Sequence, residues 1–388
     1  MLKNHVNEVM FNVATLCFFI SIHSISPYIS RYAISLGAIE WEVALLGPAL
    51  SVTAISFRPL SGFLIDRGKL KFLTVAGILS TMAAQAIYSL SNSVKIMYIG
   101  RVVHGLGVAL FIPASVYTAT IVGRGAAGAL VWRSAMIGLA ATLGPAIGGV
   151  VIGLYGYQAL FILTFTLQIV SALLSSTALK NLRYGRNDRR GSLRDLCRAD
   201  FITASISILC YSSMYNSLTL LLPAYHKVAG VEIALTTLIF TVISLFNLIS
   251  RIILSALINR VRFHVVAAAG YGAALLGVVL IALNPASQHV VLYAAATGIG
   301  AGLLIPSLQV IALLDIEGRS RGIASGIYTA MFDVGNIIGP PTAVLLGRTY
   351  LNALKVSTYL ALPGLAILLS ILTPITTRGS GRTFSIQN

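Results

Sequence analysis

The sequence is short of charge, and above all of acidic charge. Only 10% of its 388 residues are charged, and just 11 are Asp or Glu. A soluble domain carries about 25% charged residues, whereas 57% of this chain is hydrophobic and its mean hydropathy is +0.88. A water-soluble fold cannot bury that much apolar surface. The scarcity of charge therefore excludes a chain of soluble domains and indicates a membrane protein.

Other absences narrow the function. The three cysteines, Cys17, Cys197 and Cys210, have no metal-ligand spacing and suggest no disulfide framework. The chain has no His-Glu-x-x-His zinc motif and no Gly-rich phosphate loop. We therefore expect no enzyme activity, no metal and no cofactor, and no domain that could drive transport with ATP.

Long stretches contain no charged residue at all, for example 134–179 and 265–314. Each is too long for one membrane span of about 20 residues and suits two. Gly and Pro divide them, at Gly153–Gly156 and at Asn284-Pro285. Lipid offers the backbone no hydrogen-bond partner, so such spans must be helices. We predict an all-α membrane protein with spans at 9–31, 42–65, 72–92, 96–119, 128–153, 157–179, 201–225, 233–258, 264–284, 289–314, 322–347 and 353–375.

The net charge of +16 would suggest nucleic-acid binding in a soluble protein. Here the basic residues gather in loops on the side that holds both termini, as in Arg67–Lys71, Lys180–Arg198 and Arg260–Arg262. By the positive-inside rule that side is cytoplasmic. The first apolar stretch is too long for a cleaved signal peptide. We therefore predict a multi-pass plasma-membrane protein with cytoplasmic termini and no nucleic-acid partner.

The chain divides into two similar halves. We predict an N-terminal six-helix bundle over 1–179, a basic cytoplasmic linker over 180–200, a C-terminal bundle over 201–375 and a cytoplasmic tail over 376–388. A duplicated six-span unit is typical of secondary transporters, which bind their substrate between the halves near the midplane. At an offset of 193, Arg58 matches Arg251, Gly105–Gly107 matches Gly298–Gly300 and Leu110–Pro113 matches Leu303–Pro306, while Gly144-Pro145 matches Gly339-Pro340 at an offset of 195.

Three motifs carry a family resemblance. Arg58 to Lys71 contains Gly62, Asp66, Arg67 and Gly68; Arg101 to Gly107 reads Arg-x-x-x-Gly-x-Gly; and Gly144-Pro145 is followed by Gly148-Gly149. Together they resemble the major facilitator superfamily over essentially the whole chain, and the last resembles a motif of its drug/proton antiporters. One residue is missing after Arg67, and Ala140 stands where the antiporter motif usually has Gly.

The resemblance implies a fold and a mechanism. It implies twelve helices in two pseudo-symmetric six-helix bundles, working as a monomer in a lipid bilayer by alternating access. It also implies a conformational latch at Gly62, Asp66 and Arg67, with Asp66 facing the positive end of the eleventh helix. The alternative is that Asp66 and Arg67 merely cap a helix.

The antiporter-like motif has a local physical meaning as well. Gly144 and Pro145 are expected to bend the fifth helix, because Pro removes a backbone hydrogen bond. Gly148 and Gly149 are expected to allow tight helix packing. The alternative is the ordinary bending of a membrane helix.

Ionisable residues inside a membrane are expensive and often functional. Asp333 is the only acidic residue well inside a predicted span, so it is our candidate proton carrier. The alternative is a buried partner for Arg251 or another Arg. Arg101 and His104 are further candidates for ion coupling, against the alternatives of a snorkelling Arg and a hydrogen-bonded His. Arg133 is expected to reach the cytoplasmic interface.

A set of polar and aromatic residues near mid-span forms the predicted substrate cavity, although a packing role remains the alternative for each tyrosine. They are His23, Tyr28, Tyr215, Asn216, Asn247, Arg251, Tyr328 and Asn336.

Three functions fit these observations. The first is proton-coupled efflux of small apolar or cationic molecules, which the antiporter-like motif and Asp333 favour. The second is uptake of a small organic anion, because Arg58, Arg101 and Arg251 outnumber Asp333. The third is a membrane sensor or scaffold that does not transport.

Overall fold

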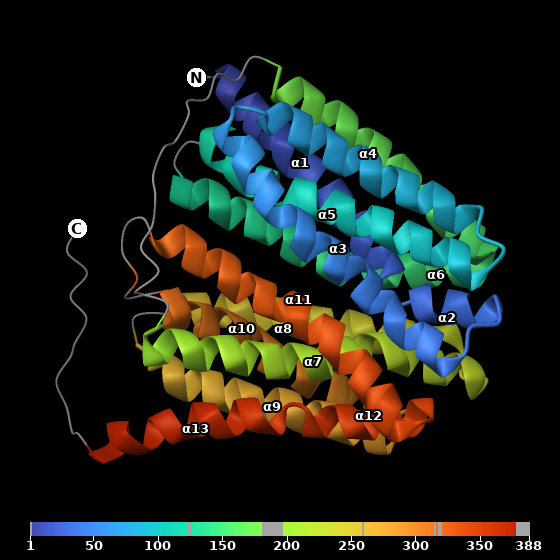
Figure 1. The fold of residues 1–388 in the computed structure, drawn as a ribbon, viewed down its shortest axis with the longest axis vertical. Helices are drawn as coiled ribbons and strands as arrows, with labels where there is room; N and C mark the ends of the chain where they lie inside the picture. Colours follow the sequence, from blue (N-terminus) through green and yellow to red (C-terminus); the bar gives the residue numbers. More distant parts are fainter. Residues whose placement is uncertain are drawn as a thin grey trace.

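The structure is a computed structural model that describes residues 2–122, 126–180, 197–257, 260–313, 316 and 320–377. Within these ranges every regular element is a helix, as the sequence predicts. The helices run side by side across the molecule (Figure 1). They are α1 (Leu2–Ile25), α2 (Ile29–Ser35), α3 (Glu40–Asp66), α4 (Leu70–Ser89), α5 (Val94–Val122), α6 (Ala126–Ala178), α7 (Ala199–Val228), α8 (Ile233–Ala256), α9 (Phe263–Leu283), α10 (Val290–Leu313), α11 (Ser320–Gly347), α12 (Tyr350–Tyr359) and α13 (Leu362–Thr377).

The helices account for the predicted number of spans. In the described ranges, 10 helices are long and apolar enough to cross a membrane. One of them, α6, has 53 residues and is interrupted at Gly156, whose φ of 83° is outside the helical region, so it makes two crossings. Such a φ favours glycine. The more polar α11 is also long enough, with 28 residues, which brings the crossings to twelve.

Two spans have different ends from those predicted. The first was expected over 9–31, but α1 ends at Ile25 and the short α2 begins at Ile29. Pro27 explains the break, because the residue before a proline is disfavoured in helical conformation. The last was expected over 353–375, but it consists of α12 and α13, which are separated at Leu360–Ala361.

The internal repeat is present in the helix packing. Gly105 of α5 lies against the Leu50 carbonyl of α3, and Gly298 of α10 lies against the Ile243 carbonyl of α8. Both members of this contact are offset by 193 residues. Glycine contacts between α4 and α5, and between α9 and α10, obey the same offset. Small residues let membrane helices approach this closely, so the matched glycines build two equivalent sets of close contacts.

The helices form two groups, α1 to α6 and α7 to α13, which lie in the upper and lower parts of Figure 1. We call the end where α1 begins and α13 finishes the inner end, and the end that holds α2 and Gly156 the outer end. The groups meet mainly along two pairs of helices, α3 with α11 and α6 with α8, which we call the α3–α11 seam and the α6–α8 seam, and α7 also contacts α2 and α3. Any site between the halves is bounded by these seams.

Candidate functional site

The α3–α11 seam holds an ion pair that joins the two halves. Arg58 of α3 donates from Nη1 to the Asp333 carboxylate of α11, and the two side chains are 23% and 14% exposed. Asp333 is therefore paired, as our alternative interpretation had it. Of the partners that the sequence offered, Arg58 is the one in contact, and Arg251 is not. A paired carboxylate in a span can change its charge only if the pair can be broken.

Asn336 forms further contacts across the α3–α11 seam, nearer the outer end. Its side-chain amide donates to Ser51 Oγ at 2.8 Å and to the Gly47 carbonyl at 3.4 Å. Gly47 leaves room for this side chain, because a Cβ on it would lie 2.6 Å from the Asn336 side-chain oxygen. Predicted as a cavity residue, Asn336 instead bonds directly across the seam.

At the inner end of the α3–α11 seam, a Cβ on Gly62 would meet none of the described atoms within 4 Å. The side chains at the start of α11 lie outside the description of the structure, so the close approach implied by the resemblance stays a prediction. Arg67 follows the end of α3 and places its guanidinium 4.1 Å from the centre of the Phe63 ring. The Asp66 side chain lies outside the description of the structure. The latch stays a prediction for another conformation.

The α6–α8 seam is held by close backbone approach. Gly149 lies directly against Thr237. Midway along the seam, Thr142 Oγ1 donates a hydrogen bond to the Ser244 carbonyl at 3.4 Å. The innermost contact is at Gly138, where a Cβ would lie 2.9 Å from the Leu248 side chain. In all three contacts the two residue numbers have the same sum. The helices α6 and α8 are therefore antiparallel and keep one register along the seam.

The antiparallel register of α6 and α8 depends on the Gly-Pro motif. Gly144 and Gly148 seat α6 on α1, because a Cβ on Gly144 would lie 2.6 Å from His23 Cβ and one on Gly148 would lie 2.8 Å from the Tyr28 ring. Gly149, on another side of the helix, serves the seam instead. The motif thus packs α6 on both sides.

Tyr28 joins three helices at the outer end. Its hydroxyl donates to the Pro145 carbonyl of α6 at 2.7 Å and lies 2.9 Å from Thr237 Oγ1 of α8. The side chain is 1% exposed. Tyr28 was a predicted cavity residue, but it is a buried part of the contact between the halves.

A second outer contact was missed by the sequence reasoning. Arg31, the last residue of the first predicted span, lies in α2 and is 6% exposed. It donates to Thr236 Oγ1 at 3.2 Å and to the Val231 carbonyl at 3.1 Å. His226 lies 2.8 Å from the same Thr236 hydroxyl. Because the first span ends early, the α2 segment folds back over the second half, which no pattern in the sequence signals.

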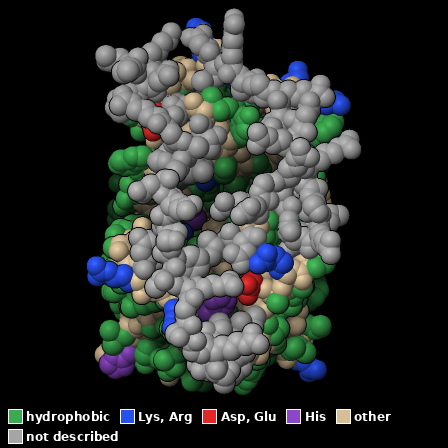
Figure 2. Space-filling view, turned by 90° about the vertical axis from the view of Figure 1, so that its left-hand side faces the viewer, with side chains coloured by type: hydrophobic (Ala, Val, Ile, Leu, Met, Phe, Trp, Pro, Cys, Tyr) green, Lys and Arg blue, Asp and Glu red, His purple; other side chains and the backbone are tan. Residues whose placement is uncertain are grey.

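The inner end is hollow between the halves. Figure 2 shows this end, with an opening that runs inward between its two sides. Arg251 of α8 stands one turn inward from Leu248, beyond the last seam contact, and its side chain is exposed. Across from it in the α6 register, Ala135 is exposed as well. Arg251 is therefore accessible at the inner end of α8, beyond the last contact of the α6–α8 seam.

Aromatic and polar groups of α7 lie near Arg251. Tyr211 and Tyr215 stack with ring centres 5.7 Å apart, and both are close enough to interact electrostatically with Arg251. Within the described residues, Tyr211 Oη and Asn216 Nδ2 are buried without a hydrogen-bond partner. Of the predicted cavity set, the structure thus brings Tyr215 close to Arg251, and Asn216 follows Tyr215 in α7.

The other predicted cavity residues are more scattered. Tyr328 of α11 is 4% exposed and its hydroxyl has no partner among the described residues. The backbone carbonyl of Asn247 packs against Gly302, where a Cβ would lie 2.5 Å from it. His23 has its ring 6.2 Å from that of Phe19. These three are not brought together.

Arg101 and His104 lie inside the first half, away from the seams. Arg101 is 8% exposed and donates from Nε to the Leu46 carbonyl of α3 at 2.8 Å. His104 Nδ1 lies 3.3 Å from the Tyr88 hydroxyl. Arg101 is thus bonded within the bundle instead of snorkelling to the surface. A role for either in ion coupling stays a prediction.

Arg133 is buried, contrary to the expected interfacial position. Its side chain is 8% exposed and donates from Nε and Nη2 to Ser115 Oγ at 3.0 and 2.7 Å. Its guanidinium also stands 5.9 Å from the centre of the Phe19 ring. A hydroxyl and an aromatic face replace the interfacial water that the prediction assumed.

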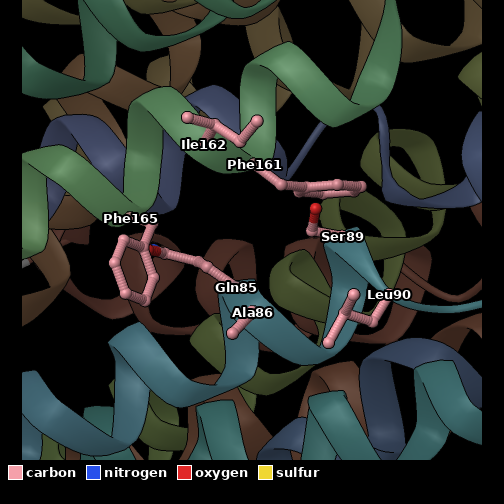
Figure 3. Close-up of a pocket in the computed structure, with 7 residues that line it drawn as sticks. All are labelled: Gln85, Ala86, Ser89, Leu90, Phe161, Ile162 and Phe165. Atoms are coloured by element: carbon pink, nitrogen blue, oxygen red, sulfur yellow. The ribbon is translucent and has the colours of Figure 1, made fainter.

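A separate pocket lies in the first half, between α4 and the second part of α6. Gln85 and Ser89 face Phe161 and Phe165 across it (Figure 3), and its volume is about 250 Å³. None of the predicted site residues lines it. The pocket is away from both seams, so it does not belong to the candidate site.

Comparison with protein families gives one clear match. The model described as Major Facilitator Superfamily matches residues 11–340 and 232–383. An uncharacterized MFS-type transporter of Methanocaldococcus jannaschii is 24% identical over 363 residues, which cover 87% of this chain and 90% of that protein. The methylenomycin A resistance protein of Bacillus subtilis is 27% identical over 161 residues, or 40% of this chain and 33% of that protein.

Solved structures are similar in fold. A bacterial homolog of the human lysosomal transporter Spinster, in an inward-facing and unoccupied conformation, aligns with a TM-score of 0.77 at 13% identity, over 98% of this chain and 99% of that one. The nucleoside transporter NupG aligns with a TM-score of 0.73 at 13% identity, over 96% and 99%.

Proposed function

This chain belongs to the major facilitator superfamily, and from that premise we propose that it is a secondary active transporter that exports a small solute in exchange for protons. The coarser part, a membrane transporter of this family, follows from the family match over almost the whole chain. The mode of coupling and the direction are our proposal, as is the absence of an enzymatic reaction.

Alternating access is the proposed mechanism. The two halves touch at the outer end through Tyr28, Arg31 and Asn336, while the inner end is hollow. This arrangement suits a carrier that is open to one side, and transport requires the opposite arrangement in turn. With both termini cytoplasmic and the protein a monomer in the plasma membrane, the hollow opens to the cytoplasm, where an exporter collects its substrate.

Asp333 is the proposed proton carrier, and its pairing with Arg58 is the single observation that carries the coupling. The pair links α3 to α11, so rocking of the halves changes the distance between its members. An unpaired carboxylate away from water is costly. When Arg58 withdraws, Asp333 therefore binds a proton, and when Arg58 returns, the proton is released. Proton binding is in this way tied to the conformation.

Efflux is favoured by the kind of relatives that the chain has. The Bacillus subtilis methylenomycin A resistance protein and multidrug resistance protein 2 match parts of it at 27% identity. The sequence favoured apolar or cationic substrates because of Asp333. The pairing of Asp333 with Arg58 removes that negative charge from the hollow, whereas Arg251 is exposed. This observation favours a second candidate function, uptake of a small organic anion.

A substrate panel on purified protein in liposomes tests the proposal. A pH gradient of either sign is imposed, and solute flux and proton flux are measured together. Export against a gradient when protons move the opposite way is the expected result. Solute and proton moving the same way supports the uptake function, and no flux for any solute contradicts transport. The control is Asp333→Asn, which should abolish proton movement coupled to solute.

A further inference from the structure

The two seams are related by the internal repeat, but only one has a charge pair. Arg58 and Arg251 are equivalent, and each stands on the seam helix of its own half, α3 or α8. Arg58 has Asp333 as its partner. At the offset of 195 that aligns Gly144-Pro145 with Gly339-Pro340, the counterpart of Asp333 is Gly138. The second arginine therefore faces a helix that has no carboxylate at the corresponding place.

The space beside Gly138, where its counterpart Asp333 has a carboxylate, is close to Arg251. Gly138 faces Leu248 across the α6–α8 seam, and Leu248 is one helical turn from Arg251 on the same face of α8. Beyond this contact the helices part, and Ala135 and Arg251 are both exposed. An acidic group on a solute in the hollow can thus occupy, beside Arg251, the position that the Asp333 carboxylate occupies beside Arg58.

Beside Arg251, on α7, a buried tyrosine hydroxyl has no hydrogen-bond partner among the described residues. Among the described residues, Tyr211 Oη and Asn216 Nδ2 are buried with no partner, and Tyr211 is 0% exposed. Buried polar groups are normally hydrogen-bonded, so each orphan calls for a partner. No ion pair among the described residues includes Arg251. A ligand that brings negative charge would give Arg251 the partner that it lacks.

We infer that Arg251 binds the carboxylate of an organic anion, which completes at the α6–α8 seam the ion pair that Asp333 and Arg58 form at the other. The inference rests on the proposed transport function and names its substrate class, an aromatic or aliphatic monocarboxylate. Tyr215, which is partly exposed and stacks on the buried Tyr211, gives the apolar part of the ligand an aromatic face. The guanidinium group of Arg251 suits a carboxylate because it presents two parallel N–H donors.

The first test supplies the missing carboxylate from the protein itself. Purified full-length protein is placed in lipid nanodiscs and its melting temperature is measured. The variants are Gly138→Asp and Gly138→Asn, each with and without the additional substitution Arg251→Gln. The two side chains at 138 displace Leu248 equally, so only their charge differs. We expect the Asp variant to melt about 2 °C above the Asn variant, and the difference to vanish without Arg251. No difference in the presence of Arg251 would overturn the proposal.

The second test uses three probes of one shape, benzoate, benzamide and benzylammonium, at equal concentration with the nanodisc protein. Benzoate alone should raise the melting temperature, because a ligand that binds the folded state stabilises it. The shift should be lost in Arg251→Gln and in Gly138→Asp, and kept in the exposed control Arg262→Gln. An equal shift with benzamide or benzylammonium, no shift with any probe, or a benzoate shift that survives Arg251→Gln would each contradict the proposal.

Neither test involves a pH gradient or transport. Benzoate binding without proton-coupled flux would contradict the proposed function and leave this site intact. Proton-coupled flux of other solutes, without benzoate binding, would contradict this site and leave the proposed function intact.

Discussion

The α3–α11 seam and the α6–α8 seam are built from equivalent helices, yet they are held by different forces. The first has a charged pair, Arg58 with Asp333, and the amide of Asn336. The second has glycines pressed against its partner helix and the hydroxyl of Tyr28. An ion pair can be switched by a proton, whereas close packing can only be made or broken by movement. We infer that one seam senses protons and the other follows.

Loss of the charge pair should change the difference between the two seams most. Arg58→Gln leaves Asp333 without its partner, and we expect it to destabilise the protein by about 3 kcal/mol, as for other broken buried pairs. Denaturant titration of the purified protein measures this. The double variant Arg58→Gln, Asp333→Asn has no unpaired charge and should be more stable than Arg58→Gln alone. If it is less stable, the pair does not contribute as described.

Adding a side chain at Gly149 disturbs the packing of the α6–α8 seam. A Cβ there would overlap Thr237, so Gly149→Ala should prevent full closure of the outer end and cost about 2 kcal/mol of the closed form. Cysteine labelling from the outer side should increase about tenfold or more. Gly153→Ala is the control, because its Cβ would lie 3.8 Å from Ile233. Equal labelling of the two variants would show that the seam tolerates the extra atom.

Removing the Tyr28 hydroxyl weakens the same seam more gently. Tyr28→Phe keeps the ring but loses the bonds to the Pro145 carbonyl and Thr237, which should cost the closed form about 1 kcal/mol. Outer labelling should rise about fivefold, less than for Gly149→Ala. The exposed Tyr155, replaced by Phe, serves as the control. A larger effect for Tyr28→Phe than for Gly149→Ala would reverse the order of forces that we assign.

The smallest expected effect concerns the proposed latch at the inner end of α3. In the conformation with a closed inner end, Asp66 would face the start of α11, a contact worth about 0.5 kcal/mol. Asp66→Ala should therefore shift the populations modestly toward the form that is open at the inner end, as followed by side-specific cysteine labelling. Its repeat counterpart is Asn259, so Asn259→Ala should shift them less. Equal shifts would remove this asymmetry between the halves.

The sequence predicts the helices well, because lipid imposes a strong rule on them. Runs without charge predict the spans, and the glycines around Gly156 predict the division of α6. The repeat is found from matched Arg, Gly and Pro. The ends at Pro27 and Leu360 were missed, because the hydrophobic run continues past both and outweighed the proline signal at Pro27.

The site is much less predictable, because its contacts join residues far apart in the chain. Arg58 and Asp333 are separated by 275 positions, and the sequence offered several arginines as equal partners. Arg31 was predicted only as the end of the first span, and its contact with Thr236 depends on how α2 packs against the second half. Arg133 was expected at the interface because nothing in one dimension shows Ser115 beside it.

The matched glycine contacts of α5 and α10 have a consequence for ancestry. Two separate copies of one six-span unit would pair as a symmetric dimer, in which every residue at one seam has an identical twin at the other. In such a dimer, Asp at the position of 333 would also stand at the position of 138. A single seam with a carboxylate is possible only once the copies are joined in one chain and free to diverge. Fusion thus allowed one seam to acquire a carboxylate while the equivalent position of the other seam stayed a glycine.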